Sequence, residues 1–187
     1  MAANPSVGAA IGREPRIRTK PQDSPVPPSL NLPKNALMKG HSQLRKGRTS
    51  VDNQIYHVST ATHDWRPLFL DFNCGRVVIQ CLKYESDARH LDTLAFVVMP
   101  DHLHWLLSLS PGRSLSECVK NVKCNSARMI NRRLGSSGRV WMTAFYDRAI
   151  RREEDIAAVA RYIVANPLRA GIVNSLREYP LWDAKWV

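Results

Sequence analysis

The sequence predicts an α+β fold built on one antiparallel sheet, and three observations lead to this class. Short runs with the two-residue period of β-strands alternate with longer segments in which apolar residues recur at helical spacing. Two of the strand-like runs are separated only by a tight turn, which makes them antiparallel neighbours. The 187 residues, 44% of them hydrophobic, suit one packed domain with a tail.

The first half of the predicted domain contains three strands and one helix. Alternation over 54–60 predicts the first strand, and apolar residues at helical spacing predict an amphipathic helix over 72–89. A continuous apolar run over 94–98 predicts a buried strand, and the run over 102–109 predicts its hairpin partner. We expect these last two strands to lie side by side at the centre of the sheet.

The second half adds a helix, a strand and a final helix. A helix is predicted over 114–133, because its first residues have the S-x-x-E spacing of a capping box. Residues 145–150 predict a fourth strand, and the acidic residues at 153–155 begin a last helix that Pro167 ends. The order β-α-β-β-α-β with an extra helix is typical of the ferredoxin-like, or split βαβ, fold, with its helices on one face of the sheet.

The positive charge is concentrated at the N-terminus. Of the net charge of +11, the first 50 residues carry +7, from nine basic and two acidic residues, and seven of the 12 prolines lie within the first 33 positions. Such a segment cannot bury enough apolar surface to fold, so residues 1–42 are predicted to be a disordered basic arm and residues 43–187 a single domain. Such an arm is typical of nucleic-acid binding; the alternative is a solvated leader without a partner. Candidate phosphate contacts just after the arm are Arg45, Lys46 and Arg48.

Composition and motif content exclude several classes of protein. The chain has no apolar stretch long enough to cross a membrane and no signal-peptide pattern at its start, so an intracellular protein with no membrane partner is expected. The four cysteines do not form CxxC pairs, so we expect reduced, mostly buried thiols rather than a zinc knuckle or a disulfide framework. No glycine-rich phosphate loop is present, and we expect no small-molecule organic cofactor.

The sharpest local feature is the pair His102 and His104 on a predicted strand. Residues two apart on a strand point to the same face, so both imidazoles would leave one face while Leu103 enters the core. Two imidazoles at this spacing can chelate one divalent metal, with one further protein ligand, water or substrate oxygens completing the site. The alternative is a pair of histidines that are exposed or hydrogen-bonded within the core.

The last predicted helix places a phenol and an amide together. Tyr162 lies about 100° of helix rotation from Ile163, which marks the core face, so Tyr162 should flank the core rather than fill it. Asn166, four residues on, should lie on the same side one turn later. A phenol is a poor nucleophile at neutral pH unless a cation stabilises its ionised form, and the histidine pair could hold that cation. The alternative is a half-buried tyrosine with its hydroxyl in water.

Two long motifs carry a resemblance to a known family. Residues 96–107 resemble the His-hydrophobic-His (HUH) signature of single-tyrosine transposases, and residues 160–173 resemble their catalytic-tyrosine helix in the version found in REP-associated tyrosine transposases. The opening at 44–48 with 55–56 and the close at 179–183 are similar to the same subfamily. The resemblance thus covers about residues 43 to 187.

The resemblance implies a metal-dependent enzyme that cleaves and rejoins single-stranded DNA at REP-type hairpins. In it Tyr162 would be the nucleophile that forms a 5′-phosphotyrosine link, and His102, His104 and Asn166 would bind Mg²⁺ or Mn²⁺. The link would keep the phosphodiester energy, so a 3′-hydroxyl could reverse the step without ATP. The family analogy also implies a cytoplasmic, nucleoid-associated protein and favours a monomer over a dimer that exchanges its tyrosine helices.

The sequence departs from the family pattern at the predicted fourth strand. Several relatives would have histidines at the positions of Tyr146 and Arg148, so Tyr146 is a competing phenol, or both are surface residues beside the DNA. Trp105 and Trp141 could stack on unpaired bases, although Trp105 should face the core. Further candidate phosphate contacts are Lys120, Lys123, Arg148, Arg151 and Arg152.

Two other functions remain open at this point. One is a non-catalytic DNA-hairpin binding protein, which need not retain His102, His104, Tyr162 and Asn166 together. The other is a replication-initiator or relaxase-like nickase with the same chemistry, which the REP-type ends of the chain disfavour.

Overall fold

The computed structural model describes residues 50–151 and 154–186. The predicted arm at 1–42 and the candidate DNA contacts Arg45, Lys46, Arg48 and Arg152 lie outside the described residues. Within these two ranges, no helix is both long and apolar enough to span a bilayer.

The described chain folds into one antiparallel sheet of five strands in the order β4-β1-β3-β2-β5. The first four strands have the predicted ferredoxin-like order, so the predicted fold class is confirmed, and β5 is an addition at the edge. The strands are β1 (Ile55–Ala61), β2 (Leu91–Met99), β3 (His102–Leu109), β4 (Tyr146–Ala149) and β5 (Trp182–Ala184), and the α-helices are α2 (Phe72–Asp87), α3 (Leu115–Leu134), α4 (Ile156–Val164) and α5 (Asn166–Arg169). Three single 3₁₀ turns complete the set: η3 (His63–Trp65), η4 (Leu68–Leu70) and η5 (Leu176–Glu178).

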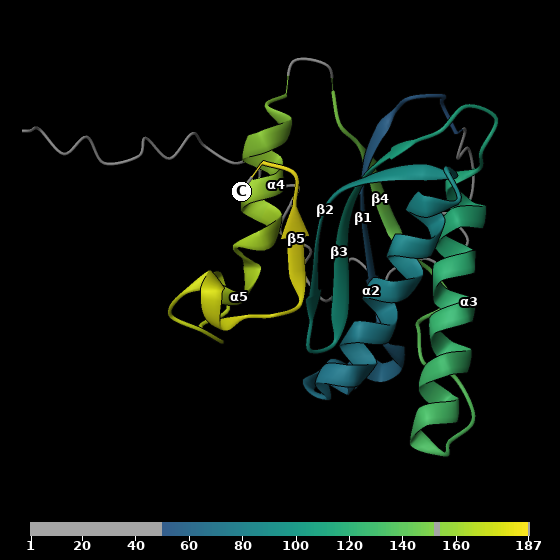
Figure 1. Cartoon of the computed structure of the whole chain (residues 1–187), viewed down its shortest axis with the longest axis vertical. Coiled ribbons are helices and arrows are strands. Elements are labelled where there is room, and N and C mark those ends of the chain that lie inside the picture. The colour runs from purple at the N-terminus through teal and green to yellow at the C-terminus, as the bar shows by residue number, and fades with distance from the viewer. Residues whose placement is uncertain (1–49, 152–153, 187) are drawn as a thin grey trace, which may run out of the picture.

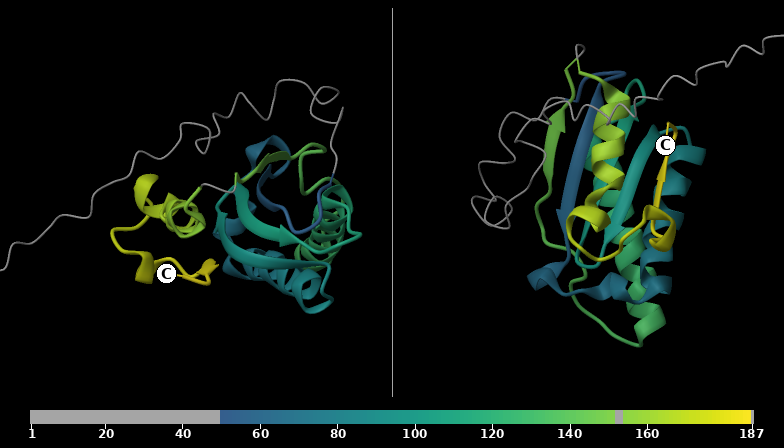
Figure 2. Two further views of the ribbon diagram at one scale, coloured as in Figure 1. Left: turned by 90° about the horizontal axis from the view of Figure 1, so that it is seen from above. Right: turned by 90° about the vertical axis from the view of Figure 1, so that its left-hand side faces the viewer.

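Helices cover the two faces of the sheet unequally. Helices α2 and α3 pack against each other on one face, whereas α4 lies on the other face against β2 and β3 (Figures 1 and 2). The expectation of helices on one face, with the tyrosine helix as an addition, therefore describes the layers correctly. Among the described elements, the two long helices α2 and α3 close one face of the sheet, and α4 and α5 lie on the other.

Local sequence signals set the ends of these elements. The side chains of Asp71, Ser114 and Asp155 accept hydrogen bonds from backbone N–H groups in the first turns of α2, α3 and α4. Pro100 and Asp101 alone join β2 to β3, as the predicted tight turn requires. Strand β2 begins three residues earlier than predicted, because a register irregularity between Thr93 and Ala95 interrupts its pattern.

The core lies mainly between the sheet and the pair α2–α3. Along β3, Leu103, Trp105 and Leu107 are almost completely buried, and the ring of Trp105 donates a hydrogen bond from Nε1 to Thr93 Oγ1 at 3.1 Å. The prediction that Trp105 faces the core is confirmed. The predicted reduced thiols are also confirmed: the cysteines are free, with Cys74, Cys81 and Cys118 buried and Cys124 exposed.

A C-terminal segment that the sequence prediction missed completes the sheet. Strand β5 pairs with β2, and just before it the hydroxyl of Tyr179 donates a 2.6 Å hydrogen bond to the carbonyl of Val98. Leu181 packs so closely on Gly75 of α2 that a Cβ at that position would lie 2.5 Å from Leu181 Cδ1. A strand of three residues is too short to show a period of two, so its pairing is evident only in the fold.

Candidate active site

The candidate site is on the face of the sheet that α4 approaches, where β1 and β3 pair. In their antiparallel register Ser59 lies opposite His104 and Ala61 lies opposite His102. Directly paired residues share a face, as do residues two apart on one strand. The side chains of His57, Ser59, His102 and His104 therefore share one face, as predicted for the histidine pair.

The two histidines direct the same nitrogen toward each other. His102 Nε2 and His104 Nε2 are 3.2 Å apart, and their rings are nearly perpendicular. Each remaining ring nitrogen has its own partner: His102 Nδ1 lies 2.5 Å from Asp101 Oδ1, and His104 Nδ1 lies 2.7 Å from Ser59 Oγ. A proton on each Nδ1 that bonds to these oxygens leaves both Nε2 lone pairs available as ligands.

Burial keeps the inner imidazoles of this face neutral. Desolvation lowers the pKa of His104 well below its usual value, and the nearby His102, His57 and Arg169 lower it further. His57, whose Nε2 lies 3.2 Å from His104 Nδ1, is also buried, and desolvation together with the charge of Arg148 lowers its pKa to about 4. Neutral imidazole is the form that coordinates a metal.

The donor set fits a divalent cation. Two ligands about 2.1 Å from one ion, at tetrahedral or octahedral angles, lie about 3.0–3.4 Å apart, which matches the separation of the two Nε2 atoms. Within the described residues, no three or more His, Cys, Asp or Glu side chains are grouped so that they could hold a metal. The protein's third ligand would therefore have to come from another residue type, such as the amide oxygen of Asn166.

Tyr162 and Asn166 lie at the end of α4 and the start of α5. Tyr162 is half-buried and packs against the core cluster, so its predicted place beside the core is confirmed. Helix α4 ends at Val164, within one residue of the end that the sequence predicts at about Ala165, and Ala165 keeps helical backbone angles. Asn166 Nδ2 donates a 2.7 Å hydrogen bond to the carbonyl of Ile163 in the same helical segment. The other amide atom, Oδ1, is the one that could bind a metal ion.

Arg169, in α5, contacts the side chain of Tyr162. Its guanidinium carbon lies 3.6 Å from the centroid of the Tyr162 ring, and Nη2 donates a hydrogen bond to the Tyr162 hydroxyl. Its charge also acts on His104. Arg169 is a candidate functional residue that the sequence did not predict. The available signal is its spacing of seven residues from Tyr162, which corresponds to two helical turns.

Strand β4 brings Tyr146 and Arg148 to the same face. Tyr146 lies opposite Ser59 and Arg148 opposite His57 in the β1–β4 register. Arg148 is mostly buried and forms an ion pair with Glu154, while its Nη1 is buried with no hydrogen-bond partner among the described residues. Tyr146 is thus a second phenol on the site face, and Arg148 is committed in part to a carboxylate.

Comparison with known proteins identifies the family. Residues 50–166, which include both histidines, Tyr162 and Asn166, match the family model described as IS200-like transposase. The chain belongs to the IS200-like transposase family. A Haemophilus influenzae relative assigned as a REP-associated tyrosine transposase is 25% identical over 109 residues, which span 52% of this chain and 62% of the relative. The match to this curated relative thus covers less than two thirds of its length.

A solved structure supports the fold of this IS200-like transposase. A REP-associated tyrosine transposase bound to a REP hairpin has a TM-score of 0.57 and 22% identity, covering 72% of this chain and 79% of that chain. A further structure, assigned as a transposase from Deinococcus radiodurans, has a TM-score of 0.44 and 22% identity over 68% of this chain and 92% of that one. The first match and the curated relative bear the subfamily name that the sequence motifs indicated.

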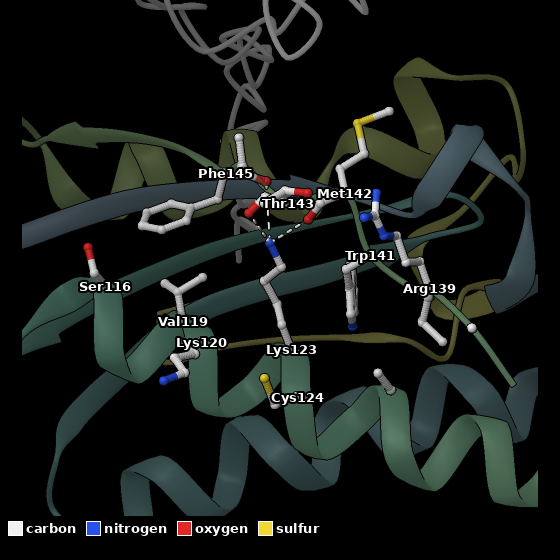
Figure 3. A pocket seen from close by; sticks show the side chains of 14 residues that line it. Ser116, Val119, Lys120, Lys123, Cys124, Arg139, Trp141, Met142, Thr143 and Phe145 are labelled. Carbon is white, nitrogen blue, oxygen red and sulfur yellow. Dashed lines mark hydrogen bonds between the residues drawn. The ribbon is translucent and has the colours of Figure 1, made fainter. Parts of the chain in front are cut away.

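Two residues that the sequence analysis considered as DNA contacts of the transposase have partners within the fold. Lys123 of α3 donates from Nζ to the backbone carbonyls of Met142, Thr143 and Ala144, at 2.6–3.3 Å, and so holds the segment before β4 against α3 (Figure 3). Trp141 is buried, with its ring 5.2 Å from that of Phe69, and cannot stack on a base.

The other predicted phosphate contacts divide between the two faces. Lys120 is exposed, but its helix α3 lies on the face of the sheet opposite to that of α4 (Figures 1 and 2). Arg151 is exposed two residues after the end of β4. Among the described basic residues that the sequence predicted as phosphate contacts, Arg148 is the one that strand register places on the face of the histidines.

Proposed function

We propose that this chain is a hairpin-binding DNA strand-transferase that cleaves and rejoins single-stranded DNA through Tyr162. The observation that carries the proposal is the single arrangement of a phenol, a cation and a convergent histidine pair: Arg169 contacts Tyr162 and its charge acts on His104. The relative and the solved structure named as REP-associated tyrosine transposases, the latter bound to a REP hairpin, support REP-type hairpins as the substrate class.

His102, His104 and the amide oxygen of Asn166 are the proposed ligands of Mg²⁺ or Mn²⁺. When bound, the ion would neutralise charge on the scissile phosphate. Asp101 and Ser59 fix the two rings through their Nδ1 atoms, so the chain itself orients both Nε2 atoms. This support is independent of the family match, because it rests on hydrogen bonds of this chain.

Tyr162 supplies the nucleophile. In the forward step its phenol oxygen bonds to the scissile phosphorus, the bond from phosphorus to the 3′-oxygen breaks, the phenol proton passes to water, and the 3′-oxygen takes up a proton from water. A 5′-phosphotyrosine and a free 3′-hydroxyl result, and attack by a 3′-hydroxyl reverses the step with no change in the number of phosphodiester bonds.

Arg148 of β4 and Arg151, which follows it, are proposed phosphate contacts. The buried, unpartnered Nη1 of Arg148 is a donor that a phosphate oxygen would satisfy. Arg45, Lys46, Arg48 and Arg152 remain proposed contacts by their charge alone. We further propose that the protein acts as a monomer at the nucleoid.

The direct test is covalent capture of DNA. The wild type is incubated with Mn²⁺ and a labelled single-stranded oligonucleotide that carries a fixed stem-loop and randomised flanks. We expect a denaturant-resistant adduct whose linked residue maps to Tyr162 by mass spectrometry, and its complete loss in Tyr162→Phe with unchanged hairpin binding. Chelation of the metal should abolish the adduct in the wild type.

The matched control is Tyr146→Phe, since Tyr146 is the other phenol on the site face. It should retain the adduct, whereas an adduct that maps to Tyr146 would overturn the assignment of Tyr162. Hairpin binding without any adduct would instead favour the non-catalytic binding protein. Cleavage without strand joining would favour the nickase.

A further inference from the structure

Arg169 makes two different contacts with the phenol of Tyr162. The guanidinium lies over the aromatic ring, with its central carbon 3.6 Å from the ring centroid, and one of its nitrogens donates to the hydroxyl. A cation over a ring face and a charge-assisted hydrogen bond are each attractive, and together they fix both the plane of the ring and the position of its oxygen.

The local backbone holds Arg169 at this position. Pro167 lies within the first turn of α5 and is buried, and the N–H groups of Arg169 and Ala170 donate to the carbonyls of Ala165 and Asn166. Two short turns therefore connect the end of α4 to Arg169, and the arginine reaches back along the chain to the tyrosine.

We propose that Arg169 is a catalytic residue that stabilises negative charge on the Tyr162 oxygen in both directions of strand transfer. The inference rests on the proposed function. As Tyr162 loses its proton and attacks phosphorus, its oxygen is negatively charged until the new bond forms. In the reverse step the same oxygen leaves phosphorus with the bonding electron pair, and the guanidinium N–H donor stabilises it again.

The test compares Arg169→Gln and Arg169→Lys with a matched surface variant. Glutamine keeps a hydrogen-bond donor without charge, and lysine keeps the charge without the planar stack. Arg161→Gln, on exposed α4 surface beside Asp155, removes the same charge away from the phenol. The measured quantities are the single-turnover rate of adduct formation against pH, the rate of rejoining, hairpin affinity and the melting temperature.

We expect Arg169→Gln to slow adduct formation and rejoining on the order of 10²-fold, the loss typical of one charge-stabilising donor. Its rate should reach its plateau at higher pH, with hairpin affinity and melting temperature unchanged. Arg169→Lys should recover part of the rate, and Arg161→Gln should match the wild type. A ring-fluorinated tyrosine at position 162, a more acidic phenol, should reduce the defect of Arg169→Gln.

Two results would overturn the role of Arg169. One is a rate in Arg169→Gln equal to that of Arg161→Gln; the other is a defect that fluorination leaves unchanged, which would indicate a purely structural residue. Both presuppose that the wild type forms an adduct at Tyr162. Absence of that adduct in the wild type overturns the proposed function itself, so the two failures are distinguishable.

Discussion

The two faces of the central strands differ in nearly every respect. Alternate residues of β3 enter a closed apolar core on the side of α2 and α3, whereas the residues between them include His102 and His104 on the side of α4. The same eight-residue strand thus contributes to folding on one side and to the candidate site on the other. In this fold, the residues of the core and the residues of the candidate site are therefore separated by side-chain alternation along one strand rather than by distance.

The polar face also carries polar atoms that folding leaves unsatisfied. His57 Nδ1 and Arg148 Nη1 are both buried without a hydrogen-bond partner among the described residues, and the two side chains lie opposite each other in the β1–β4 register. Such atoms destabilise a fold by about 1–3 kcal/mol each. A bound phosphate oxygen could satisfy the donor of Arg148.

The largest expected effect comes from the apolar face. Trp105→Ala removes a fully buried side chain next to the histidine pair in sequence, and it should lower the free energy of unfolding by about 3–5 kcal/mol. His102→Ala, on the other face, should lower it by at most about 1 kcal/mol while abolishing the DNA adduct. Chemical denaturation checks both, and equal losses of stability would break the distinction between the faces.

A smaller effect is expected from removing a hydrogen-bond partner of the histidine pair. Ser59→Ala removes the 2.7 Å partner of His104 Nδ1, so the affinity for Mn²⁺ should fall about 10–100-fold, the usual effect of losing such a partner. Mn²⁺ binding is measured by electron paramagnetic resonance. The control is Ser108→Ala, on the same face of β3 but four residues from His104. An equal loss of Mn²⁺ affinity in this control would contradict the role of Ser59.

The smallest effect concerns the edge where the C-terminal segment joins the sheet. Burial raises the pKa of Tyr179 to about 12 from 10, so its ionisation is easier in the unfolded chain, and stability should fall as pH rises from 10 to 12. Tyr179→Phe should flatten this fall and, by losing the bond to Val98, should cost about 1 kcal/mol at neutral pH.

The buried thiols of Cys81 and Cys118, whose pKa burial raises to about 11, add a separate alkaline loss of stability. They are present in both proteins, so the difference between the wild-type and Tyr179→Phe denaturation curves reports Tyr179 alone. Parallel curves above pH 10 would contradict the prediction.

The sequence predicted the features that depend on local periodicity. The hairpin around Pro100, the shared face of His102 and His104, and the flanking position of Tyr162 each follow from the spacing of residues within one element, and each is confirmed. The sheet order also follows from element order, because few topologies connect such elements. The predicted ligands and nucleophile remain proposals, since their roles require DNA and metal.

The features that the sequence did not predict depend on contacts between elements. Lys123 has the charge of a phosphate contact, but its ammonium is used by three carbonyls about twenty residues away in sequence. Ser59 and Asp101 become partners of the histidines through strand register and turn geometry, and Arg169 reaches Tyr162 through the turn of α5. The sequence shows that residues of these types are present, but their partners depend on how the elements pack together.

The placement of β4 and β5 has a consequence for the segment between them. These strands form the two opposite edges of the sheet, and the chain from one to the other contains α4 and α5. The tyrosine helix is therefore tethered at both ends to the domain whose histidines it faces. The distance that Tyr162 can move relative to the histidines is therefore limited by its connections to two edge strands that are both paired into the sheet.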